Sequence, residues 1–99
     1  MKKTPQYNHD PIPLRNVGND ESVENPGDFY WVDNTLWIAI PSDDPEWDNM
    51  SIIRIACADK QSPGVWQWNG DKEKPTLSPS VHTVGVWHGW IRAGMLVEA

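Results

Sequence analysis

Short apolar runs separated by polar turn residues make up most of the chain from residue 29 onward. The run FYWV, the dipeptide Asp33-Asn34 and the run TLWIAIP predict a β-hairpin, because β-branched and aromatic residues lie on both sides of a short polar turn. Side chains alternate between the two faces of a strand, and TLWIAIP is apolar at both parities. We therefore expect it to be a central strand.

Three further stretches continue this pattern. MSIIRIACA predicts a third long strand, although periodicity alone leaves a short helix open. VWQW predicts a short strand that ends at Asn69-Gly70-Asp71, residues that tolerate turn conformations. VWHGWIR and MLVEA predict a second hairpin with Gly94 at its turn.

The segment KPTLSPSVHT is extended but interrupted by Pro75 and Pro79. Proline has no backbone N–H, so this segment cannot donate a full ladder of hydrogen bonds. An edge strand or a strand-like loop is therefore expected here.

Residues 1–28 have a different composition. They carry four prolines and a run of Asn, Asp and Glu, with few apolar side chains to offset the entropy of ordering. The sequence thus predicts a flexible or loosely docked N-terminal arm over residues 1–28 and a single β domain over residues 29–99. The fold class is all-β: a small sandwich or open barrel of about six short strands.

Charge and cysteine content narrow the class of protein. The net charge is −6, which repels phosphate backbones, so duplex nucleic acid is not an expected partner. No apolar run is long enough for a membrane helix, and the N-terminus lacks a signal-peptide pattern, so we expect a soluble, cytoplasmic protein. Cys57 is the single cysteine and is expected to be an ordinary buried thiol.

Seven tryptophans offset the low fraction of apolar residues, because each large ring can bury a large apolar surface. Strand alternation assigns five of them to the core: Trp31, Trp37, Trp66, Trp68 and Trp87. Trp47 is expected to anchor a loop. Trp90 stands apart as the ring whose exposure would point to function.

The strongest candidate for a binding surface is one face of residues 86–92. If these residues form one strand, His88, Trp90 and Arg92 share a face opposite Trp87 and Ile91. An imidazole, a flat ring and a planar cation on one face can stack on an aromatic group and hold a carboxylate or phosphate. The alternative is that Trp90 belongs to a second layer of packing and Arg92 is a solvated cation.

Four polar residues of the preceding segment have one parity and would line the same groove if the two segments pair: Thr76, Ser78, Ser80 and His82.

Catalytic and metal motifs are weak. We predict no catalytic residues, since Ser78 and Ser80 lie near His82 in sequence but neither an orienting acid nor an oxyanion hole is visible. The paired Cys/His spacing of a structural zinc site is missing, so no metal and no cofactor are predicted. Four residues are the weak candidates for a metal site: His82, His88, Asp71 and Cys57.

The combination W-x-W-N-G-D, K-P-T-L-S-P-S-V and W-H-G-W-I-R-A-G resembles a family of small bacteriophage and prophage proteins, some of which carry a mistaken label of ammonia monooxygenase. The resemblance covers residues 65–97. It implies a phage or prophage origin, the bacterial host cytoplasm as location and a mostly β fold, and it implies no particular activity.

Three functional hypotheses follow. The first is a non-catalytic β binding module that takes a host protein or a small metabolite. The second is a structural or assembly protein that forms homo-oligomers through an aromatic edge. The third is a degenerate metal-binding domain.

Overall fold

The computed structural model describes residues 11–42, 50–60, 62–83 and 86–98. These residues form two β-sheets and one short 3₁₀ helix, η1 (Asp20–Ser22), and contain no α-helix. The all-β fold predicted from the sequence is therefore confirmed. Within the same residues, no helix has the length and apolar character needed to cross a bilayer. The expected loop anchor Trp47 lies outside them.

The larger sheet has six strands in the order β2-β3-β4-β5-β6-β7. Their bounds are β2 Arg15–Asn16, β3 Asp28–Val32, β4 Thr35–Pro41, β5 Met50–Ala58, β6 Trp66–Trp68 and β7 Leu77–Ser78. The predicted first hairpin is β3 and β4, and Asp33 at its turn has a positive φ of 54°. β4 pairs on both sides, with β3 and β5, as the apolar character of its two faces predicts.

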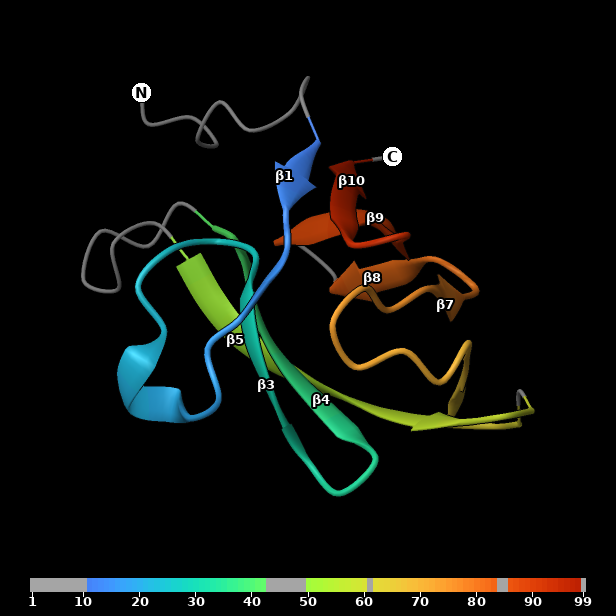
Figure 1. Ribbon diagram of the computed structural model, residues 1–99. Helices are drawn as coiled ribbons and strands as arrows, with labels where there is room; N and C mark the ends of the chain where they lie inside the picture. Colours follow the sequence, from blue (N-terminus) through green and yellow to red (C-terminus); the bar gives the residue numbers. More distant parts are fainter. Residues whose placement is uncertain (1–10, 43–49, 61, 84–85, 99) are drawn as a thin grey trace.

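The smaller sheet has four strands in the order β1-β10-β9-β8. Their bounds are β1 Ile12–Pro13, β8 Val81–Thr83, β9 Trp87–Arg92 and β10 Met95–Glu98. β9 and β10 are the predicted second hairpin, with Ala93 and Gly94 at positive φ in its turn. Figure 1 shows β8, β9 and β10 packed to one side of the long β5 ribbon, which curves across the molecule.

The number of strands exceeds the predicted six for two reasons. The segment around Pro79 is divided into β7 and β8, which belong to different sheets, so the chain crosses from one sheet to the other at Pro79 and Ser80. In addition, residues before β3 pair with both sheets: β1 pairs with β10, and β2 runs parallel to β3.

An ion pair between the exposed Arg15 side chain and the buried Asp28 holds the segment between β2 and β3. The Arg15 guanidinium donates to both carboxylate oxygens of Asp28 at 3.0 and 2.8 Å. The Asp28 carboxylate also accepts the backbone N–H groups of Glu24 and Asn25 at 2.9 and 3.0 Å. Burial raises the pKa of Asp28, but these hydrogen bonds and the Arg15 charge outweigh it and the net pKa is lowered.

Both sheets contribute to one core. Fully burying each large apolar side chain contributes about 1.5–3 kcal/mol, and the core side chains come from most of the longer strands. The larger sheet supplies Phe29, Leu36, Ile38, Ile40, Ile55, Cys57 and Leu77, and the smaller sheet supplies Val81, Trp87, Ile91 and Leu96.

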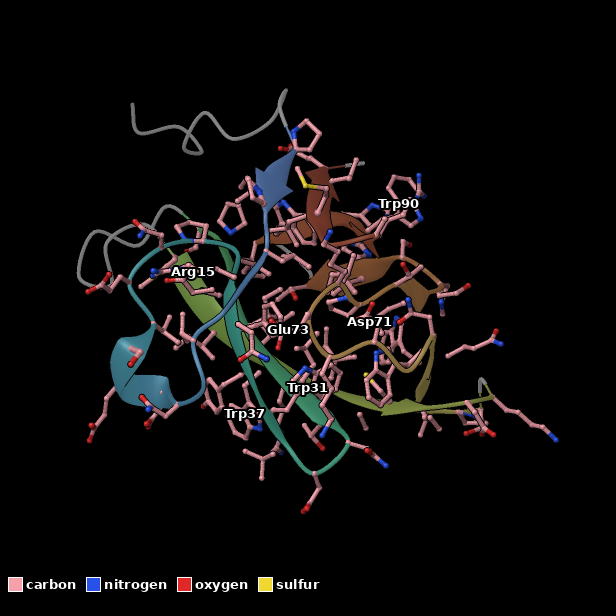
Figure 2. The ribbon with its side chains drawn as sticks, in the orientation of Figure 1. Arg15, Trp31, Trp37, Asp71, Glu73 and Trp90 are labelled. Carbon is pink, nitrogen blue, oxygen red and sulfur yellow. The ribbon has the colours of Figure 1, made fainter. Side chains whose placement is uncertain are left out.

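The tryptophans divide differently from the prediction. Trp87 is buried in the core, and Trp31, Trp66 and Trp68 are half-buried and pack against it. Trp37 does not belong to the core. It lies on the opposite face of β4 from the buried Leu36 and Ile38, stacks on Tyr30 at 5.9 Å between ring centroids, and points away from the smaller sheet in Figure 2.

Candidate active site

The contact between Ser80 and His88 is the most informative arrangement on the surface. Ser80 lies between β7 and β8, and His88 is the second residue of β9. The Ser80 Oγ atom and the His88 Nε2 atom are 3.1 Å apart, within hydrogen-bonding distance. This places a hydroxyl and a titratable imidazole, eight residues apart in sequence, in direct contact.

The antiparallel register of β8 and β9 creates this contact. Val81 pairs with Gly89 and His82 with His88, so the residue preceding β8 lies beside the outer face of β9. Val81 is buried and His82 is exposed, which directs the imidazoles outward. The β8–β9 pairing therefore fixes where the His88 ring stands relative to Ser80.

His88 is flanked by aromatic groups on the same face. The His82 ring lies 4.6 Å away and the Trp90 ring 6.1 Å away, centroid to centroid. The Arg92 guanidinium lies 5.0 Å from the centroid of Trp90. The predicted common face of these residues is thus present, with the buried Trp87 and Ile91 on the other face.

Gly89 allows the strands around this face to pack closely. A Cβ atom at residue 89 would overlap both the Trp87 ring and the main-chain oxygen of Val97 on β10. Only glycine fits at this point. The position of His88 therefore depends on Gly89, because only a residue without a Cβ atom lets β9 lie this close to β10.

Trp66, on the larger sheet, contacts the main chain at Ser80. Its indole N–H donates to the main-chain oxygen of Ser80 at 3.3 Å. Sequence reasoning assigned Trp66 to the core and missed this role. No local pattern in the sequence predicts this contact, because it depends on how the chain crosses between the two sheets.

The remaining candidate residues lie elsewhere. Ser78 is exposed on β7, where it pairs with Gln67 on β6. The Asp71 carboxylate accepts the backbone N–H groups of Glu73 and Lys74, both at 2.9 Å, and these hydrogen bonds, that of Lys74 first, lower its pKa. Figure 2 shows Asp71 in the loop between β6 and β7, apart from Trp90.

The four metal candidates are only partly brought together. His82 and His88 are neighbours, whereas Cys57 is buried with its thiol directed at the main-chain oxygen of Ile55 at 3.4 Å. Among the residues that the structure describes, no group of three or more His, Cys, Asp or Glu side chains could hold a metal ion.

The site thus places a serine hydroxyl in contact with an imidazole, at a strand pair of a small all-β domain. One family model matches most of the chain. The model of BubE, described as bacterial ubiquitination-like system serine protease, matches residues 19–99. The chain therefore belongs to the BubE family.

The two other comparisons add no relative. No curated protein and no solved structure matches the chain.

Proposed function

We propose that this chain is a serine peptidase in which Ser80 is the nucleophile and His88 the general base. The single observation that carries the proposal is the 3.1 Å contact between Ser80 Oγ and His88 Nε2. The description of the BubE family, serine proteases of a bacterial ubiquitination-like system, supports a polypeptide as substrate and such a system as the setting.

The geometry supports a two-step reaction. As the Ser80 oxygen attacks the carbonyl carbon of a peptide bond, the unprotonated Nε2 atom of His88 takes the hydroxyl proton. The same proton passes to the leaving amine, which departs and leaves an ester on Ser80. A water molecule then attacks the ester with His88 as base, and the serine is regenerated with release of the carboxylic acid.

Two features of the chain hold these groups in place. The hydrogen bond from the Trp66 indole fixes the main chain at Ser80, and the β8–β9 register with the His82 ring limits where the His88 imidazole can stand. Holding the nucleophile and the base in the geometry of attack lowers the activation barrier, and this proximity effect is a large contribution to catalysis.

Labelling with a fluorophosphonate tests the proposal. This reagent modifies activated serine hydroxyls, so mass spectrometry of the digested wild-type protein should locate one adduct on the peptide that contains Ser80. Ser80→Ala should abolish the adduct. Ser78→Ala is the matched control, because it removes a neighbouring hydroxyl that pairs with β6 and should leave labelling unchanged. A folded wild-type protein that is not labelled would contradict the proposal.

A second candidate function rests on the Trp90 and Arg92 pair. The guanidinium over the ring, beside His88, supports a non-catalytic site that holds an aromatic or carboxylate group of a host protein or small metabolite. This candidate keeps the phage or prophage origin that the sequence resemblance implies. It predicts ligand-dependent quenching of tryptophan fluorescence that Trp90→Ala removes while Ser80→Ala does not.

A further inference from the structure

An open hollow lies directly beside the residue that precedes Ser80. It is lined by Ser62, Pro63, Gly64, Val65, Trp66 and Pro79 and has a volume of about 510 Å³. Apart from one hydroxyl, the side chains that line it are apolar. A volume in this range is that of sites that enclose small ligands or side chains.

The wall of the hollow is a preformed turn. The backbone N–H of Val65 donates to the main-chain oxygen of Ser62 at 2.9 Å. The backbone N–H of Ser62 donates to the main-chain oxygen of Val65 at 3.4 Å. Gly64 closes the turn with a φ of 75°, in the region that favours glycine. Backbone hydrogen bonds therefore fix the turn that forms this wall of the hollow.

Trp66 connects this wall with the candidate nucleophile. One side of its indole lines the hollow, and its N–H donates to the main-chain oxygen of Ser80. Pro79, which also lines the hollow, is the residue bonded to Ser80. A side chain seated in the hollow would consequently lie next to the reacting bond.

The hollow continues onto the outer face of the larger sheet. A second hollow of about 420 Å³ shares Gly64 and Trp66 with the first and extends to Trp37 and Arg54. An extended polypeptide rises about 3.3 Å per residue, so a substrate that spans both hollows would place successive residues in them. The shape suits an extended chain better than a compact small molecule.

We infer that the Ser62–Trp66 hollow is the specificity site of the peptidase, and that it receives a large apolar side chain that flanks the scissile bond of an extended polypeptide. This inference rests on the proposed function. The apolar lining and the adjacency to Ser80 select the chemistry of the substrate: leucine-like or phenylalanine-like residues are favoured there, and charged residues are not, because a charge would be desolvated without a partner.

Internally quenched peptides test the inference. Each position that flanks the cleaved bond is varied among Gly, Ala, Leu, Phe, Asp and Lys, and KM and kcat are measured for the wild type and for Val65→Phe, which fills the hollow. The wild type should prefer Leu or Phe at one flanking position. Val65→Phe should raise KM for those peptides by about tenfold or more, as removing space for a few methylenes does, and should leave the peptides with Gly unchanged.

Ile52→Phe is the matched control, because Ile52 is exposed on β5 and lines neither hollow. It should leave the preference unchanged. In Ile52→Phe, Ser80 should react with the fluorophosphonate at the wild-type rate. Val65→Phe should still form the Ser80 adduct, which shows that the nucleophile is present.

The outcomes separate the two proposals. If Ser80 is labelled but the wild type cuts no peptide of the series or cuts all of them equally, the specificity site is wrong while the nucleophile stands. The same holds if Val65→Phe keeps the wild-type preference. If folded wild-type protein is not labelled at Ser80, the proposed function itself fails, and the specificity site with it.

Discussion

His82 and His88 are cross-strand partners on β8 and β9, with ring centroids 4.6 Å apart, yet His88 is the one whose Nε2 atom contacts Ser80. The planes of the two rings differ by 32°, so the rings pack in a tilted arrangement. Under the proposed function the two imidazoles have different tasks: His88 takes the proton of Ser80, and His82 restricts the motion of His88.

Replacement of each histidine by alanine should separate these tasks. We expect His88→Ala to slow fluorophosphonate labelling of Ser80 by about 10²-fold or more, the usual contribution of a general base. His82→Ala should slow it by about tenfold or less, since the base remains and only its packing partner is lost. The measurement is the second-order rate constant of labelling. Equal losses in the two variants would contradict the assignment.

Much of the fold could be predicted from the sequence because local signals are strong where hairpins form. Alternating apolar residues around Asp33-Asn34 and around Ala93-Gly94 specify both hairpins without reference to any distant contact. The structure of the segment around Pro79 was harder to predict. Its prolines indicated an edge, but its division between two sheets depends on how the sheets pack on one another.

The sequence predicts which residues share the candidate binding face, but it does not predict which histidine contacts Ser80. Strand alternation places His88, Trp90 and Arg92 together, since this requires only the local period of a strand. The hydrogen-bonding partner of Ser80 could not be predicted in this way. Proximity in sequence directs attention to His82, whereas the register of β8 against β9 selects His88, and that register is fixed by buried side chains of both strands.

Trp37 shows where alternation alone misleads. Both parities of β4 are apolar, so the sequence could not tell which face meets the core, and Trp37 is on the face that does not.

We expect Trp87→Ala to lower the free energy of unfolding by about 3–5 kcal/mol, because it empties a buried ring site. Trp37→Ala should cost less than about 2 kcal/mol. Urea denaturation monitored by circular dichroism checks both, and comparable losses would contradict the assignment of Trp37 to the surface.

Cys57 provides a chemical test of which nucleophile acts. Burial raises the pKa of its thiol to about 11, and the side chain is buried in the core. At pH 8 only about one thiol in 10³ is then ionised, and the thiolate is the reactive form. Iodoacetamide should therefore leave both Cys57 and the labelling of Ser80 unchanged in the native protein, and should alkylate Cys57 in urea. Loss of Ser80 labelling after iodoacetamide treatment would point to a thiol instead.

Asp28 should make stability depend on pH in the acid range. Its pKa is lowered in the folded protein, so the stabilisation from its ionised carboxylate is complete above the unfolded pKa of about 3.9 and is lost as the pH falls through the folded pKa. Asp28→Asn keeps the shape of the side chain but removes the charge and one of the acceptor oxygens.

We expect Asp28→Asn to be less stable than the wild type at pH 7 by about 2 kcal/mol, since charge-assisted hydrogen bonds to the N–H groups of Glu24 and Asn25 and to Arg15 are weakened. The difference should shrink as the pH falls below about 4, because the wild-type carboxyl is then protonated as well. Urea midpoints at pH 7, 5, 4 and 3 measure this. A difference that stays constant over the series would mean that the charge of Asp28 does not stabilise the segment between β2 and β3.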